Sequence, residues 1–311
     1  MIRIGIGIGE IGNQPATVAD LVAQAQRAER EGFASGWIAN IFGMDAITTA
    51  VVVGRETRSI ELGTAVVPTY PRHPYAMAQQ AMSAQAAIDG RFALGIGLSH
   101  QIVIEGMLGL SFAKPYTHMK EYLGVLAPLV REGQVSHAGE EFRVHASLRV
   151  TGAKPCPILV AALAPKMLEL AGSVADGTIT WMTGPKTVRD YTAPRIREAA
   201  ARAGRPEPRV IVSLPIAVTE DVAAAREAAS RTFQIYGSLP SYRAMLDREG
   251  AVGPADVVVA GDEDAVGEAV ERLGEGGATE LLAIPFGFGS KPAAAIERTR
   301  ALLTRLAGAR S

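Results

Sequence analysis

The chain has 311 residues, of which 48% are hydrophobic and 20% are charged, enough apolar side chains for a sizeable buried core. Its 31 Lys and Arg residues are balanced by 32 Asp and Glu residues, which excludes the basic excess needed to bind nucleic acid or an anionic membrane. A single cysteine, Cys156, excludes an intramolecular disulfide and a cysteine-based zinc site.

No apolar run reaches the roughly 18 residues of a membrane span, and the N-terminus shows neither a basic region nor a cleavage site. The sequence therefore predicts a soluble, cytoplasmic protein with a small-molecule substrate.

Short apolar strands alternate with amphipathic helices through the first half of the chain. The predicted strands are residues 2–8, 36–41, 60–67 and 92–98. Thr17 and Asp45 are expected to open the first two helices, and Gly32 to end the first. Two further helices are predicted over residues 74–88 and 116–131. Residues 134–150 alternate polar and apolar side chains around a turn at Gly139, which predicts an inserted hairpin.

The same alternation resumes in the second half of the chain. The predicted strands are residues 157–162, 178–181, 210–218 and 280–285. The predicted helices are residues 165–174, 187–203, 221–236, 241–249, 262–273 and 292–306. The strands are continuous apolar runs, which is typical of a parallel sheet covered by helices.

Eight strands, each followed by helix, predict a (β/α)8 barrel, the TIM barrel fold. Such a barrel needs about 250 residues, and the surplus fits the hairpin after the fourth helix and the extra helices after the seventh strand. No linker or change of composition divides the chain, so residues 1–311 are expected to form one domain. The alternative is an open doubly wound sheet.

Two glycine-rich segments resemble the dinucleotide-binding pattern GxGxxG, which needs a helix directly after its third glycine. In the first segment, Gly7 to Gly12, Asn13, Gln14 and Pro15 delay the helix, so we interpret it as a turn at the barrel mouth. The second, Gly95-Ile-Gly97, has His100 at the third position. No metal-binding motif and no Walker loop is present.

Polar side chains follow the third and fourth predicted strands: Thr69, Tyr70, Arg72, His73, Ser99, His100 and Gln101. In a barrel these residues share the face on which active sites are built. For His73 or His100 alone, a capping or surface role is an equal alternative. The other histidines are weaker candidates, because one falls in a helix and two in the hairpin: His118, His137 and His145.

Two more segments follow predicted strands. Small residues at 161–164 precede the helix that starts with Pro165 and Lys166, and such a helix N-terminus favours an anion. Lys166 has a second interpretation as a solvated first-turn lysine. Trp181 ends a strand ahead of Thr183, and packing in the core is its alternative role. Cys156 is assigned no role.

These residues resemble those of the luciferase-like monooxygenase superfamily, and within it the coenzyme F420-dependent oxidoreductases of actinobacteria. The resemblance rests on LGTAVVPTYPRHP from Leu62, GRFALGIGLSH from Gly90, LVAALAPK from Leu159 with VADG from Val174, and WMTGP from Trp181. It covers nearly the whole chain and implies a (β/α)8 barrel with an isoalloxazine-type ring in its mouth.

The resemblance also implies which residues bind the cofactor. The third strand should carry a bulge with a cis peptide bond at Ala65–Val66 behind the ring, and residues 161–166 should bind the phosphate-bearing tail. The implied cofactor-binding residues are Asn40, Thr64, Ala65, Val66, Gly97, Ser99, Ala161, Ala162, Leu163, Ala164, Pro165, Lys166, Trp181 and Thr183.

This sequence departs from the family pattern at one catalytic position. Asn40 stands where an acid is frequent, and Ile41 stands where the sugar-phosphate dehydrogenases of the family have a catalytic histidine. We therefore do not expect their reaction, and His100 and His73 become the candidate proton donors.

Three functions stay open at this point. The first is hydride transfer between coenzyme F420 and an organic substrate. The second is an FMN-dependent monooxygenase that uses molecular oxygen, and the third is a flavin-binding barrel without catalysis. Many family members form dimers, so a homodimer is also implied.

Overall fold

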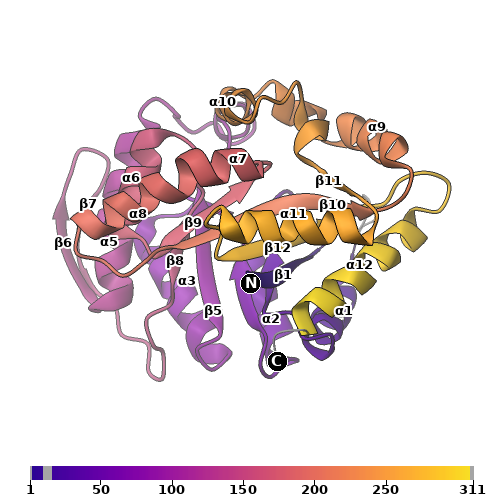
Figure 1. Ribbon diagram of the computed structural model, residues 1–311. Coiled ribbons are helices and arrows are strands. Elements are labelled where there is room, and N and C mark those ends of the chain that lie inside the picture. Colours follow the sequence, from indigo (N-terminus) through magenta and orange to yellow (C-terminus); the bar gives the residue numbers. More distant parts are fainter. Residues whose placement is uncertain (1, 10–15, 309–311) are drawn as a thin grey trace.

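Eight parallel strands close into a barrel at the centre of the computed structural model, which describes residues 2–9 and 16–308 (Figure 1). Each strand hydrogen-bonds to the next along the chain, and the last pairs with the first. The barrel strands are β1 (Arg3–Ile8), β2 (Ser35–Ile38), β3 (Glu61–Thr64), β5 (Phe92–Gly97), β8 (Ile158–Val160), β9 (Gly177–Trp181), β10 (Arg209–Val218) and β12 (Glu280–Pro285). The predicted TIM barrel is confirmed, and the closed ring excludes the open doubly wound sheet.

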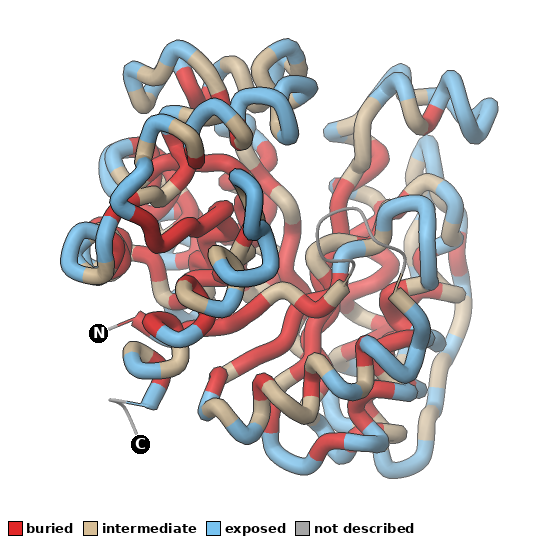
Figure 2. Tube along the Cα trace, turned by 90° about the vertical axis from the view of Figure 1, so that its right-hand side faces the viewer, coloured by how far each residue is buried: buried red, intermediate tan, exposed pale blue. Residues whose placement is uncertain are grey.

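Helices surround this barrel and cover its apolar outer surface. Figure 2 shows the buried stretches of the chain at the centre and the exposed ones toward the outside. The main ones are α1 (Val18–Arg30), α2 (Ala46–Arg55), α3 (Pro74–Ala87), α5 (Pro115–Arg131), α6 (Pro165–Val174), α8 (Ala193–Arg202), α11 (Glu263–Glu275) and α12 (Pro292–Gly308). The first begins as predicted, because the Thr17 side chain accepts from the Asp20 N–H and the Asp20 carboxylate accepts from the Thr17 N–H. Gly32 follows its end with φ 79°, a left-handed conformation that glycine adopts without a steric penalty.

Both predicted insertions are present. The hairpin after α5 consists of β6 (Gln134–Ala138) and β7 (Arg143–Ser147), which pair antiparallel. After β10 the chain adds several short elements above the barrel: α9 (Val222–Thr232), η2 (Gln234–Gly237), α10 (Pro240–Glu249), η3 (Pro254–Val257) and β11 (Val259–Gly261). Figure 1 shows α9 and α10 at the top of the molecule.

Some elements of the structure differ in detail from the prediction. The strand predicted over residues 60–67 is broken into β3 and β4 (Val67–Pro68). The helix predicted over residues 187–203 is a sequence of α7 (Pro185–Thr187), the π-helix η1 (Val188–Thr192) and α8. A short helix not predicted from the sequence, α4 (Gln101–Ile104), follows β5. The glycine-rich turn with Gly12 lies outside the described residues.

The barrel interior is filled in layers, because every second residue of each strand points inward. The central layer is apolar and consists of Trp37, Ala93, Leu159, Ile179, Ile211 and Leu282. Trp37 fits because Gly63 has no side chain: a Cβ there would lie 2.2 Å from the indole ring.

An ion-pair cluster closes the barrel below this layer. The Glu280 side chain is fully buried and accepts hydrogen bonds from Trp37 Nε1 and Arg209 Nη2, both at 2.8 Å. Arg209 also donates to Glu61 at 2.6 Å. Because the amino ends of the strands are sealed in this way, a ligand can enter the barrel only at the carboxyl ends, which we call the mouth.

Two features with functional consequences are absent from the described residues. No helix within 2–9 and 16–308 combines the length and hydropathy required to cross a membrane. The same residues hold no group of three or more His, Cys, Asp or Glu side chains arranged to bind a metal ion.

Candidate functional site at the barrel mouth

Small residues line one side of the mouth, at the ends of β3, β5 and β8. Ala65, Val66 and Ala161 are partly exposed above the central apolar layer. A Cβ at Gly97 would lie 2.7 Å from Val66 Cγ2 and 3.2 Å from Ala161 Cβ, so these residues already pack closely together. We call Ala65, Val66, Gly97 and Ala161 the small-residue rim. Three of these four residues have at most one side-chain carbon, so little side-chain bulk stands on this side of the mouth.

The rim is shaped by a bulge between β3 and β5. Gly63 pairs with Ala93 and Val67 with Ile96, so three residues of one strand face two of the other. The peptide bond between Ala65 and Val66 within this bulge is cis, as the family resemblance implied.

Thr64 fixes the bulge from behind. Its buried hydroxyl donates to the Gly95 carbonyl oxygen at 2.8 Å and accepts from the Gly95 N–H at 2.9 Å. A side chain at position 95 could not be accommodated, since a Cβ there would lie 2.0 Å from the Thr64 carbonyl oxygen. The structure therefore gives Thr64 a supporting role rather than a surface that faces a ligand.

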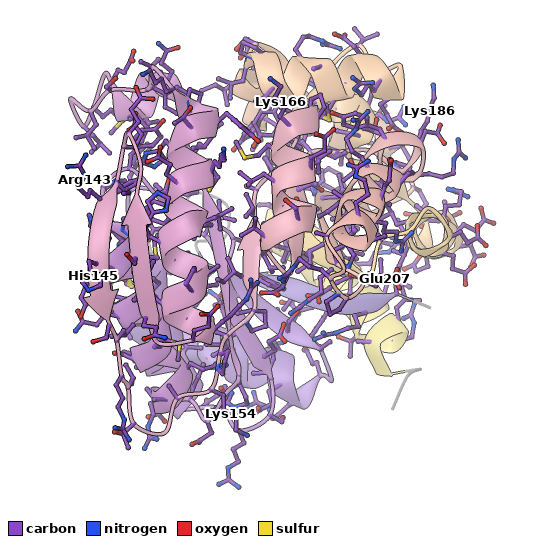
Figure 3. All side chains as sticks on the ribbon, turned by 90° about the vertical axis from the view of Figure 1, so that its left-hand side faces the viewer. Arg143, His145, Lys154, Lys166, Lys186 and Glu207 are labelled. Atoms are coloured by element: carbon purple, nitrogen blue, oxygen red, sulfur yellow. The ribbon has the colours of Figure 1, made fainter. Side chains whose placement is uncertain are left out.

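The N-terminus of α6 stands beside the rim and has no cap of its own. Its N-cap residue, Ala164, has no side-chain oxygen, and Pro165 occupies the first helical position. Ala164, Pro165 and Lys166 are exposed. Figure 3 shows Lys166 at the upper end of α6 and Lys154 at the opposite end of the molecule. No acidic side chain in the described part of the chain forms an ion pair with Lys166. These are the properties of an anion site: free amides, a favourable helix dipole and an unpaired cation.

The Ala161 N–H donates to Ile96 at 2.8 Å and is thus part of the sheet. Ala162 is buried beneath the turn, and the Leu163 carbonyl accepts from the Tyr191 hydroxyl at 3.1 Å. These contacts hold the segment between β8 and α6 in place.

Trp181 stands on the other side of the mouth. Since Ile179 belongs to the inward-facing layer, Trp181, two residues later on β9, also points inward. The turn that follows it has Met182 at φ 53° and a buried Thr183, whose hydroxyl donates to the Trp181 carbonyl at 3.4 Å. The Thr183 hydroxyl is therefore engaged within the turn itself.

The two candidate histidines lie in different environments. His100 is half-buried after β5, follows Ser99 with its positive φ of 60°, and its ring lies 5.9 Å from that of Tyr242. Burial lowers the His100 pKa, which keeps the ring neutral near pH 7. His73 is exposed, and its Nδ1 accepts from the Tyr75 N–H at 3.2 Å, so it caps α3.

Asn40 also has a local partner. Its Oδ1 accepts from the Ala46 N–H at 3.0 Å at the start of α2. The neighbouring Ile41 is 69% exposed and has no acidic or basic group.

His118 belongs to a buried cluster that the sequence alone did not reveal. It joins the polar residues that follow β4: its Nε2 lies 3.0 Å from the Thr69 hydroxyl, and its ring stacks on Tyr70 at 3.9 Å. Burial lowers the His118 pKa to about 4. In the sequence, His118 is spaced by four residues from Tyr122 and by eight from Leu126, both buried. This helical spacing was the signal that His118 faces the interior. Arg72, from the same loop, pairs with Asp45 at the start of α2.

Residues 2–309 match the model of the luciferase-like monooxygenases. The chain belongs to this family. The resemblance inferred from its motifs is confirmed.

One relative, from Mycobacterium tuberculosis, is named as a coenzyme F420-dependent oxidoreductase and is 30% identical over 242 residues, which are 72% of this chain and 69% of its own length. A 5,10-methylenetetrahydromethanopterin reductase from Methanolobus tindarius is 31% identical over 215 residues. That match spans 68% of this chain and 65% of the reductase.

Solved structures support the fold. An F420-dependent secondary alcohol dehydrogenase in complex with an F420-acetone adduct superposes with a TM-score of 0.74, at 20% identity and over 91% of this chain and 93% of the other. The tetrahydromethanopterin reductase of Methanopyrus kandleri gives 0.77 at 21% identity, over 97% and 96%. The EDTA monooxygenase from Chelativorans gives 0.79 at 14% identity, over 100% and 94%.

Proposed function

We propose that this protein is an oxidoreductase that transfers a hydride between coenzyme F420 and a small organic substrate. The observation that carries the proposal is the small-residue rim at the β3 bulge, together with the uncapped N-terminus of α6 beside it. The rim fits one face of a flat ring, and the helix N-terminus fits an anionic tail. The mycobacterial relative and two of the solved structures named above carry F420 in their names, which supports F420 over other ring cofactors.

Different residues of this chain would bind the ring and the tail of the cofactor. Ala65, Val66 and Gly97 would support the ring, and the backbone at Ala164–Lys166 would hold the tail phosphate. When bound, F420 exchanges two electrons as a hydride with a substrate carbon and does not usefully activate oxygen.

Reduction of a C=C, C=N or C=O bond by one hydride also consumes one proton. His100 is the best placed candidate for this proton transfer, because it is half-buried and follows the end of β5, three residues after Gly97. Burial lowers its pKa, so the ring is neutral. A neutral imidazole donates from its N–H poorly but relays a proton from water, and a general acid or base of this kind contributes about 10²–10⁴-fold.

The competing function is that of an FMN-dependent monooxygenase, because the EDTA monooxygenase shares the fold with a TM-score of 0.79. Titration of the purified protein with F420 and with FMN, followed by the fluorescence of each cofactor, separates the two. We expect tighter binding of F420 and, when an organic hydride acceptor is supplied, oxidation of reduced F420 without oxygen. Tighter binding of FMN with substrate-dependent oxygen consumption would replace the proposal by the monooxygenase. Binding of F420 with no turnover on a broad substrate panel would favour a non-catalytic barrel.

A further inference from the structure

A groove of about 580 Å³ lies on the outer wall of the barrel, between the helices α5, α6 and α8. Its lining comes from α5 and the hairpin on one side and from α6 and α8 on the other, and includes Lys120, Gly124, His137, Leu170, Val174 and Ala203. In Figure 3, α5 stands between the hairpin, marked by Arg143 and His145, and α6, whose upper end carries Lys166. We call this space the outer groove.

The outer groove is separate from the mouth. The helices of a (β/α)8 barrel run antiparallel to its strands, so that helix N-termini lie near the mouth and helix C-termini lie away from it. The α6 residues of the groove, Glu169 to Val174, belong to the second half of that helix, and Ala199 and Ala203 lie at the end of α8. The groove thus opens on the side of the barrel, away from the small-residue rim.

The floor of the outer groove is apolar, because two helices meet there through small side chains. A Cβ at Gly172 of α6 would lie 2.8 Å from the Ala199 Cβ of α8, so the two helices are in close contact. Leu170 and Ala199 are buried, while Val174 is half-buried and Ala203 is exposed, and all four line the groove. An apolar chain that covers this surface is favoured, because both surfaces are removed from water.

The size of the outer groove suits a small molecule. Its volume is within the roughly 300–1,000 Å³ of ligand sites in proteins. Along α5 it extends from Tyr116 through Lys120 to Gly124, which is two helical turns or about 12 Å. Twelve of the described residues line it, whereas a stable protein interface needs roughly 20–30 residues on each side. The groove therefore fits a short chain better than a partner protein.

One acidic side chain of the groove is already engaged by the hairpin. The Glu121 carboxylate accepts hydrogen bonds from the N–H groups of residues 140–142 at 2.8–2.9 Å. His137 lies 3.7 Å from the same carboxylate. Gly139 permits this arrangement, since a Cβ there would lie 2.1 Å from Glu121 Oε2. Glu121 therefore anchors the hairpin to α5 and adds no unpaired negative charge to the groove.

The other charged residues of the lining leave one cation without a partner. Glu169 pairs with Arg195 at 3.0 Å, and Arg202 pairs with Glu198 at 2.6 Å. Lys120 is exposed and forms no ion pair with any acidic side chain that the structure describes. The unbalanced charge of the groove is therefore positive, which favours a ligand with one negative charge.

We infer that the outer groove binds a small amphiphilic carboxylate, whose apolar chain lies on the floor and whose carboxylate pairs with Lys120. The apolar stem of the lysine side chain adds to the surface under the chain, while its ammonium group stays in water at the edge of the groove. The inference is independent of the proposed function, because the outer groove shares no residue with the cofactor site at the mouth.

Octanoate and octanol, which share one alkyl chain and differ in charge, test the inference. Binding of each to the full chain is measured by calorimetry, at low and at high salt. We expect octanoate to bind saturably at low salt, and about twofold to fivefold more tightly than octanol, the range of one exposed ion pair. High salt should remove this difference, because it screens the ammonium group.

Two pairs of variants locate the ligand. Ala203→Phe fills the groove from α8 and should abolish saturable octanoate binding. Ala201→Phe, which is also exposed on α8 but lies outside the lining, should bind octanoate as the wild type does. Lys120→Gln should lower the affinity for octanoate to that for octanol. Lys154→Gln changes an exposed lysine outside the groove, at the bottom of Figure 3, and is the control.

Several results would contradict the inference. They are the lack of saturable octanoate binding, equal affinities for octanoate and octanol at low salt, and unchanged octanoate binding in Ala203→Phe. Displacement of octanoate by F420 would also overturn it, because that result would place the alkyl chain at the mouth. Lys120→Gln keeps the test decisive if Ala203→Phe does not fold, since an exposed lysine without a partner is not needed for folding.

Discussion

The Thr64 hydroxyl is bonded twice to the same residue of the next strand, since it donates to the Gly95 carbonyl and accepts from the Gly95 N–H. These two hydrogen bonds replace the backbone pairing between β3 and β5 that the bulge interrupts. A supporting residue that never faces the ligand thus determines where Ala65 and Val66 stand.

Thr64→Val tests this relationship. The change keeps the shape of the side chain but leaves the buried Gly95 N–H and carbonyl without partners, which costs about 1–3 kcal/mol for each such group. We expect a lower free energy of unfolding in urea and weaker binding of F420. Thr64→Ser retains the hydroxyl and should bind F420 nearly as the wild type does. Wild-type affinity in Thr64→Val would show that the bulge does not depend on this side chain.

The fold could be predicted from the sequence because its signals are local. Apolar strand runs, the Thr17 capping box and Gly32 each act within a few residues, and the structure has all three as expected. The break in the third strand was available only through the family resemblance, since Ala65 and Val66 read as ordinary strand residues.

The site was less predictable because its contacts connect distant segments. Tyr242 reaches His100 across 142 positions of sequence, and nothing local to either residue indicates that contact. His118 was underrated for the same reason: its partner Thr69 is 49 residues away. The periodicity of α5 placed it on a helix but did not say what that helix packs against.

The second prediction concerns the anion site at α6. Lys166→Glu reverses the charge beside the exposed helix N-terminus, and a hydrogen bond to a charged group contributes about 1.5–3 kcal/mol. We therefore expect F420 to bind about tenfold to 150-fold more weakly in a fluorescence titration. Lys154→Glu, an equally exposed charge reversal at the opposite end of the molecule, is the control and should have no effect. Unchanged affinity in both variants would leave the backbone amides as the only anion ligands.

The third prediction is a pH dependence of stability that originates in His118. Burial lowers its pKa from 6.5 to about 4 in the folded protein, so the unfolded chain binds a proton first as the pH falls. Above about pH 6.5 this histidine does not change the free energy of unfolding. Between pH 6.5 and 4 it lowers the free energy of unfolding, by about 2 kcal/mol at pH 4.5.

Urea unfolding at pH 7 and pH 4.5 measures this loss. His118→Gln cannot take up the proton and should lose about 2 kcal/mol less than the wild type between the two pH values. An equal loss in both proteins would place the acid sensitivity in other groups.

The last prediction separates the two candidate proton donors. His100→Asn should lower kcat for F420-linked turnover by about 10²–10⁴-fold, since a general acid contributes that much, while the F420 dissociation constant stays nearly unchanged. His73→Ala should leave kcat intact and reduce stability by about 1 kcal/mol, because the structure uses the His73 ring to cap α3. Pre-steady-state measurement of hydride transfer at saturating F420 distinguishes chemistry from binding. A large rise in the dissociation constant of His100→Asn with an unchanged transfer rate would make His100 a residue that positions the cofactor. A fall in kcat for His73→Ala alone would identify His73 as the proton donor. If kcat falls in neither variant, the proton comes from water.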